Sequence, residues 1–262
     1  MTYRLSVVTA ALMGCLHMAA QTDSVSARPQ WTEHMRLISM GHTDLLDTYL
    51  LQEKSTGWNL GYVSQRLYHK EGRRLVHEAQ HEINFSGAGT RSNKKSMLSA
   101  MYSLKLGWYG CWNLADGRLR LMAGGQADAS FGATYNTRNS NNPAQARASV
   151  SIDPAIKLRW QSHIGRWPLT LHYDVGMPLI GLAFSPNYGQ SYYEIFSEGN
   201  YDHNVVVTSP FTGPQLHQLL AIDFRLWRTT FTIGYKGDIR QMRANSLKYH
   251  QYTHSIVIGW RY

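Results

Sequence analysis

The feature that most constrains the fold is a strict alternation of apolar and polar residues over runs longer than ten residues. The clearest run is RASVSIDPAIKLRW, residues 147–160, in which every second residue is apolar and the residues between them are mostly polar or charged. Side chains of a β-strand alternate between two faces, so this run predicts a strand with one apolar and one charged face. Strands of soluble proteins usually have about 5–6 residues, whereas a tilted strand needs about 9–11 to cross a bilayer. The run length therefore favours a membrane-spanning strand over a soluble sandwich.

The alternation recurs along most of the chain from about residue 56 onward, most clearly at 98–108 and 118–131. Lipid cannot satisfy backbone hydrogen bonds, so membrane strands must pair in a closed sheet. We expect an all-β fold, a closed antiparallel up-and-down transmembrane barrel of about ten strands. The strands are predicted at residues 34–43, 56–68, 73–85, 95–110, 117–131, 146–163, 167–182, 214–227, 229–240 and 249–262. A further hairpin within residues 191–207 would bring the total to twelve strands.

Connections between these strands alternate in length. Short ones, such as NLADG and HIGR, alternate with longer ones, such as NTRNSNNPAQ, residues 186–214 and RQMRANSLK. Short periplasmic turns and long extracellular loops are the rule for bacterial outer-membrane barrels, so both chain ends are expected in the periplasm.

The first 20 residues have the parts of a secretory signal: Arg4, an apolar stretch at 5–13 and a small-residue exit at Ala19 and Ala20. This predicts a signal peptide at residues 1–20 and a barrel domain at residues 21–262. LMGC, ending at Cys15, also resembles a lipoprotein cleavage box, which leaves lipidation of Cys15 as an alternative.

The chain has a formal net charge of +9, although only 16 % of its residues are charged. The basic residues are divided between alternating strand faces and loop tips, and they form no single stripe with stacking aromatic residues. We therefore expect no nucleic-acid partner.

The C-terminal stretch THSIVIGWRY resembles the C-terminal signal of bacterial outer-membrane barrels, which the barrel-assembly machinery recognises. The assembly-signal residues would be Ile256, Ile258, Trp260 and Tyr262. PLIGLAFSPNYGQSYYEIF and GYKGDIRQMRANSLKYHQYTHS further resemble an uncharacterised family of barrel-like proteins of Gram-negative bacteria, known only as a domain of unknown function. The resemblance implies an outer-membrane location, among outer-membrane lipid and lipopolysaccharide, and brings no catalytic residues with it.

HEAQH, residues 77–81, matches the zinc-protease pattern H-E-x-x-H. The pattern needs a helix to bring both histidines to one metal, whereas residues four apart on a strand stand roughly 13 Å apart. We therefore predict no metal site and no cofactor here.

Ser64 and His77 lie on the expected lipid faces of neighbouring strands. A serine next to a general base on the lipid face is the arrangement of some outer-membrane lipid hydrolases, so lipid hydrolysis is an alternative function. The expected position of Ser64, near the periplasmic turn, argues against it, and no catalytic residue is predicted.

The opposite strand faces place charges of both signs in the barrel lumen. Unpaired buried charges are costly, so we expect a paired network that fills the lumen, with a narrow passage for small anions as the alternative. Its predicted members are Lys105, Arg118, Arg120, Asp128, Asp153, Lys157, Arg159, Asp174, Asp223 and Arg225.

Two extracellular features could bind ligands. Residues 185–213 are dense in Tyr, Asn and Gly, the composition of adaptable recognition surfaces, although a lid over the barrel mouth fits equally well. Four basic residues fall in or beside predicted extracellular loops and would form a rim for lipid phosphates: Lys94, Lys95, Arg240 and Arg243. The predicted function is a non-enzymatic outer-membrane barrel, structural or ligand-binding through its extracellular loops.

Overall fold

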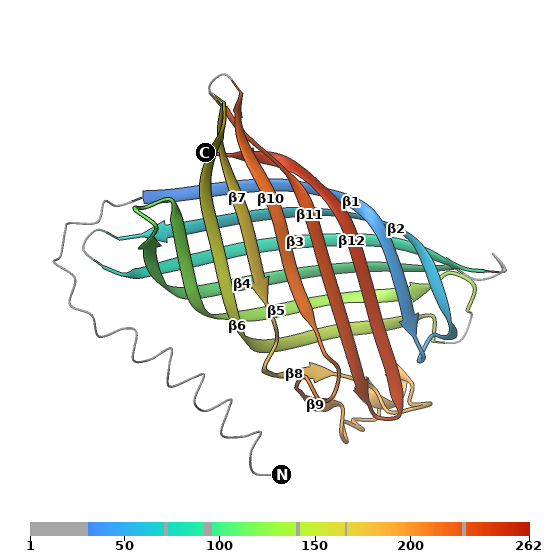
Figure 1. Ribbon diagram of the computed structural model, residues 1–262. Helices are drawn as coiled ribbons and strands as arrows, with labels where there is room; N and C mark the ends of the chain where they lie inside the picture. The colour runs from blue at the N-terminus through green and yellow to red at the C-terminus, as the bar shows by residue number, and fades with distance from the viewer. Residues whose placement is uncertain (1–30, 71–72, 92–95, 140–141, 166, 227–228) are drawn as a thin grey trace, which may run out of the picture.

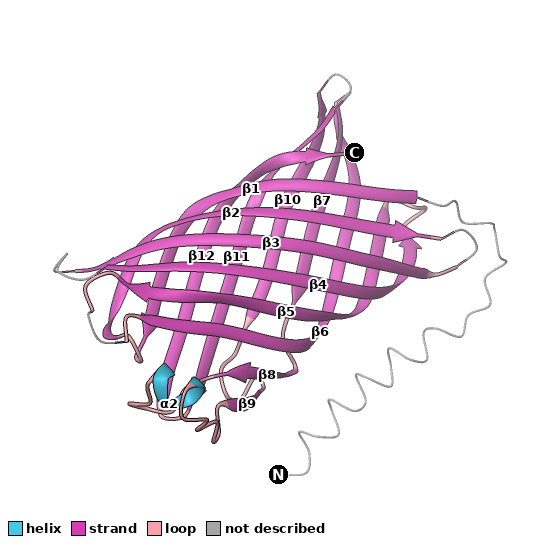
Figure 2. Cartoon of the chain, turned by 180° about the vertical axis from the view of Figure 1, so that it is seen from behind, coloured by secondary structure: helices cyan, strands magenta, loops and turns pink. Residues whose placement is uncertain are grey.

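Ten long antiparallel strands close into a barrel in the computed structural model, which describes residues 31–70, 73–91, 96–139, 142–165, 167–226 and 229–262. The expected signal peptide and Cys15 lie outside these residues. The barrel strands are β1 (Trp31–Asp47), β2 (Leu51–His69), β3 (Leu75–Thr90), β4 (Ser96–Leu114), β5 (Leu119–Asn136), β6 (Ala144–Ile164), β7 (Trp167–Gly176), β10 (Leu216–Leu226), β11 (Thr229–Ala244) and β12 (Leu247–Arg261). Figures 1 and 2 show the barrel from opposite sides.

Each barrel strand pairs with the next, β7 pairs with β10, and β12 returns to pair with β1. The closing pair extends from Met35 opposite Arg261 to Asp47 opposite Tyr249. Gly259 allows a close approach at this seam, because a Cβ atom there would lie 1.9 Å from the Arg36 carbonyl oxygen. The last strand, β12, is therefore paired on both sides, with β11 and with β1.

The polarity of the barrel is inverted relative to that of a soluble protein. Its outer face exposes large apolar side chains on strand after strand, including Trp58, Phe131 and Ile256. Its inner face buries serines, glutamines and charged residues. Water would be a poor solvent for such an exterior, whereas a bilayer matches it. Among the described residues, no helix is long and apolar enough to cross a membrane.

The two ends of the barrel differ. The C-terminus lies at the end that holds the β4–β5 and β6–β7 turns, whereas β8, β9 and α2 lie at the opposite end (Figure 1). With the topology of this fold class, the first end is periplasmic and the second extracellular.

The prediction of one strand at residues 167–182 was wrong in detail. β7 ends at Gly176, and after a break at residues 177–179 the chain continues as β8 (Ile180–Phe184) along the same edge of β6. β8 then pairs with β9 (Val205–Thr208) instead of with β10. These two extra strands and the short helix α2 (Tyr192–Phe196) belong to one extracellular segment, residues 177–215, which we call the cap.

A long extracellular loop at RQMRANSLK was also predicted wrongly. β11 continues through Ala244, and only Asn245 and Ser246 separate it from β12. Both residues have positive φ angles, 53° and 62°, as a tight two-residue hairpin turn requires.

Candidate functional site

Ion-paired side chains project into the barrel lumen and form three groups along it. At mid-height, Lys157 on β6 donates to Glu78 Oε1 at 2.8 Å and to Asp174 Oδ2 at 3.1 Å. Arg159, two residues along β6, also pairs with Asp174, and the Tyr109 hydroxyl donates to Glu78. All five side chains are almost completely buried, so this group is packed inside the barrel.

A second group closes the periplasmic end. Arg120 donates to Glu33 Oε1 at 2.8 Å, and Arg261 donates to Asp223 Oδ2 at 2.6 Å. His172 Nε2 lies 2.5 Å from the same Asp223 oxygen. The group links β1, β5, β7, β10 and β12 across the lumen, so the two edges of the closing seam are tied to the opposite wall.

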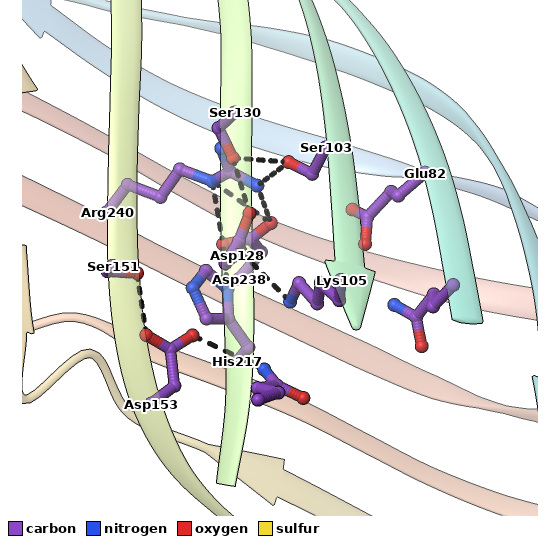
Figure 3. Close-up of polar contacts among 12 residues, drawn as sticks. Glu82, Ser103, Lys105, Asp128, Ser130, Ser151, Asp153, His217, Asp238 and Arg240 are labelled. Atoms are coloured by element: carbon purple, nitrogen blue, oxygen red, sulfur yellow. Dashed lines mark hydrogen bonds and ion pairs between the residues drawn. The ribbon is translucent and has the colours of Figure 1, made fainter. Parts of the chain in front are cut away.

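A third group lies on the extracellular side of the first (Figure 3). Lys236 binds Glu82, and Asp238 accepts hydrogen bonds from Arg240 Nε at 3.2 Å and His217 Nδ1 at 2.9 Å. Lys105 lies 3.7 Å from Asp128. Two small cavities border this group, about 60 Å³ towards the cap and about 50 Å³ towards the periplasm.

The structure places eight of the ten predicted lumen residues in these groups: Lys105, Arg120, Asp128, Asp153, Lys157, Arg159, Asp174 and Asp223. It does not bring in Arg118 and Arg225. Arg118 stands in the β4–β5 turn, Arg225 lies one residue before the periplasmic end of β10, and both are exposed. Strand parity alone does not say where a strand leaves the lumen, which is why these two were misplaced.

The predicted cationic rim is only partly supported. Arg240 was placed wrongly, because its guanidinium points into the lumen and binds Asp238 and Ser103. Its misplacement follows from the missed extension of β11, which turned a strand residue into an expected loop residue. Arg243 is exposed at the extracellular end of β11, and Lys94 and Lys95 lie outside the described residues.

The HEAQH segment lies on β3, a strand, where His77 and His81 face outwards and Glu78 faces the lumen. The residue opposite Ser64 is His81, whereas His77 stands opposite Tyr68. His81 Nδ1 lies 2.7 Å from the Tyr102 hydroxyl, and within the described part of the chain no hydrogen bond joins it to Ser64. The proposed pair Ser64 and His77 is therefore not a catalytic dyad in this structure.

Hydrogen bonds fix the cap to the barrel rim. Asn245 Nδ2, in the β11–β12 turn, donates to the carbonyls of Ser185 at 3.0 Å and His203 at 2.9 Å. The Tyr49 hydroxyl donates to the Gln190 carbonyl at 2.9 Å, and its burial, together with nearby Tyr192, raises the pKa of Tyr49 to about 12. The cap is therefore a folded structure held at a set position.

The cap also presents large side chains to the outside. Its exposed aromatic residues are Tyr188, Tyr193, Phe196, Tyr201 and Phe211, the last of them 99 % exposed. The Tyr, Asn and Gly content of this segment was apparent from the sequence, whereas the pairing of β8 with β9 and the helix α2 were not predicted.

The predicted assembly-signal residues lie on one face. Ile256, Ile258, Trp260 and Tyr262 all point outwards from β12 or its end, where they are available to lipid or to an assembly factor.

Comparison with known families gives one match, to the protein family of unknown function DUF3316, over residues 5–261. The chain belongs to this family. Among curated proteins, no relative matches.

Several solved outer-membrane barrels are similar in overall structure to this DUF3316 protein. They include the transport unit of the autotransporter AIDA-I from Escherichia coli, with 7% identity, a TM-score of 0.42 and coverage of 96% of this chain and 97% of that one. The translocator domain of the autotransporter NalP from Neisseria meningitidis has 11% identity, a TM-score of 0.39 and 98% coverage of both chains. At these values no residue or activity is carried over.

The architecture of the barrel indicates the cellular location of this DUF3316 protein. A closed antiparallel barrel with an apolar exterior and a charged interior is the architecture of outer-membrane proteins, because it leaves no backbone group unpaired in lipid. The protein is an outer-membrane β-barrel.

Proposed function

We propose that this protein is a non-enzymatic binding barrel: a closed, non-conducting scaffold that presents the cap to an extracellular macromolecule. The observation that carries the proposal is the cap itself, a folded segment clamped to the rim by Asn245 and Tyr49 that exposes five aromatic side chains. Exposed aromatic residues are costly in water and are the usual anchors of protein recognition. A rigid support reduces the entropy lost when they bind.

The filled lumen supports the non-conducting part of the proposal over the small-anion channel. The mid-height group of Lys157, Glu78, Asp174 and Tyr109 lies across the axis, and the bordering cavities hold only a few water molecules each.

Photo-crosslinking on living cells tests the binding role. A photoreactive amino acid in place of Phe211 should give a discrete protein adduct, whereas the same probe in place of Trp108, which faces lipid, should not. Identical adduct patterns from both positions, or none from Phe211, would refute the proposal.

Two envelope contacts belong to the same proposal. Trp260 and Tyr262 are proposed to engage the barrel-assembly machinery, so changing both to Asp should leave the chain unassembled and degraded. Arg243 is proposed to bind lipopolysaccharide phosphate, since guanidinium can hold two phosphate oxygens.

Substitutions of Arg243 and Arg240 distinguish binding of lipid phosphate from packing of the lumen. Arg243→Gln should reduce co-purifying lipopolysaccharide without affecting stability in zwitterionic detergent, whereas Arg240→Gln should destabilise the barrel in any medium. Unchanged lipopolysaccharide in Arg243→Gln would remove this contact from the proposal.

A further inference from the structure

Asp153 is a fully buried carboxylate that pairs with no cation among the residues the structure describes. Its side chain on β6 is 0 % exposed. It accepts hydrogen bonds from Ser151 Oγ at 2.6 Å and Gln126 Nε2 at 3.3 Å. In the described part of the chain, no ion pair includes it. Because a buried negative charge without compensation is strongly unfavourable, a positive charge is needed close by.

The charge balance of the lumen points to the same position. The mid-height group has two carboxylates, Glu78 and Asp174, and two cations, Lys157 and Arg159. The periplasmic group is likewise balanced, with Glu33 and Asp223 against Arg120 and Arg261.

The extracellular-side group is different. Its four carboxylates are Glu82, Asp128, Asp153 and Asp238, and its three cations are Lys105, Lys236 and Arg240. One negative charge is therefore in excess in the part of the lumen that contains Asp153.

His217 lies beside this excess charge. Asp238 is held by Arg240 at 3.2 Å and Lys236 at 3.6 Å, so it is ionised and its oxygen can only accept the hydrogen bond from His217 Nδ1. In the neutral imidazole, Nε2 then carries the lone pair. Asp128, Asp153 and His217 each offer one ligand atom, and these three atoms lie within 4.8 Å of one another. Figure 3 shows the His217 ring between Asp153 and the two other aspartates.

The lack of a side chain at Gly176 leaves room for this grouping. Gly176, the last residue of β7, lies between Ala155 of β6 and His217 of β10 in the paired sheet. A Cβ atom at Gly176 would already lie 3.2 Å from Gln126 Nε2, so a larger side chain would crowd the space around Asp153. Asp128 and His217 also line the cavity of about 60 Å³ towards the cap, which offers room for an ion and water.

We propose that Asp128, Asp153 and His217 bind one divalent transition-metal ion, for which Zn²⁺ is the probe. Two carboxylates and one imidazole are a mixed O and N ligand set that suits such ions. Asp238 orients the imidazole through its other nitrogen, as outer carboxylates do at many metal sites. Ligand atoms around zinc stand about 3.4 Å apart for bonds of about 2.1 Å, so atoms that lie within 4.8 Å of one another need to approach by at most about 1.4 Å. The proposal is independent of the binding role of the cap.

The test uses the full-length barrel, purified in detergent and stripped with chelator. Titration with ZnCl₂, followed by calorimetry, should give one site per chain and raise the thermal midpoint of unfolding. Asp153→Asn and His217→Gln should each lower the affinity by about 10-fold or more. The matched control is His203→Gln, which removes the histidine of an exposed His–Asp pair in the cap and should leave the site unchanged.

The metal-free variants separate a metal site from a merely structural role. Asp153→Asn keeps the shape of the side chain and removes the excess charge, so the metal-free variant should be at least as stable as the metal-free wild type, while zinc no longer stabilises it. Absence of zinc binding in the wild type would overturn the proposal, and so would equal affinity in wild type, Asp153→Asn and His217→Gln.

Discussion

The wall of the barrel has a regular part and an interrupted part. The strands from β1 to β6 have 16 to 21 residues and pair in one continuous sheet, whereas β7 and β10 have only 10 and 11. Above the point where β7 ends, the chain leaves the cylinder to build the cap and returns at Leu216. The regular wall forms most of the enclosure, and the interruption gives rise to the cap.

The lumen network joins the two parts, and its loss is expected to have the largest effect. Asp174 on the short strand β7 holds Lys157 and Arg159 from the long strand β6. Asp174→Leu should destabilise the barrel by about 3–5 kcal/mol, because it leaves the buried Arg159 without its carboxylate partner and Lys157 with Glu78 alone. Urea unfolding in detergent micelles measures this cost. Leu171→Val on the outer face of β7 is the control, and an equal loss in both variants would show that the charges do not hold the walls together.

A glycine at the closing seam and a glycine in the interrupted part should respond differently to substitution. Gly259→Ala places a Cβ atom against the Arg36 backbone at the closing seam, which cannot yield as a side chain can. We expect a loss of about 1–3 kcal/mol, and less of the compact form on unboiled gels. Gly176→Ala meets only the flexible end of Gln126, so its effect should stay below about 1 kcal/mol. Equal losses would mean that the interrupted wall is as tightly constrained as the seam.

The cap can be loosened without opening the barrel. Asn245→Gly keeps a residue that tolerates the turn's positive φ angle but removes the hydrogen bonds to Ser185 and His203. About 0.5–1.5 kcal/mol of cap docking should be lost, seen as faster proteolysis within the cap. Ser246→Gly, in the same turn, is the control. Slower or unchanged cleavage in Asn245→Gly would contradict the assigned clamp.

The smallest expected effect is a pH dependence of the same docking. The pKa of Tyr49 is raised by burial to about 12, so its hydroxyl still donates to Gln190 where an exposed tyrosine, with a pKa near 10, begins to ionise. Its contribution is fully present below about pH 10 and is lost as the pH rises through about 12. Tyrosinate absorbance should show a late-titrating contribution that is absent in Tyr49→Phe. Titration of that group near pH 10 would contradict its burial.

The sequence predicts the regular wall far better than the interrupted one. Strand periodicity records which face a residue occupies, so the ten transits and most lumen charges could be assigned from runs such as residues 147–160. Strand periodicity does not show where the paired edges of two neighbouring strands separate. The break after Gly176, the pairing of β8 with β9 and the lumen position of Arg240 depend on contacts between distant strands. The grouping of Asp128, Asp153 and His217 was missed for the same reason, since three different strands supply it.

Single-channel recording in a planar bilayer tests most directly the claim that a wall interrupted on one side still encloses a filled lumen. Purified wild-type barrel should insert without conductance steps, because the Lys157, Glu78 and Asp174 group lies across the axis. Glu78→Ala combined with Tyr109→Ala, which shortens two of the side chains that fill the lumen, should produce steps if the barrel remains folded. Stable open steps from the wild type, abolished by heat unfolding, would contradict the account.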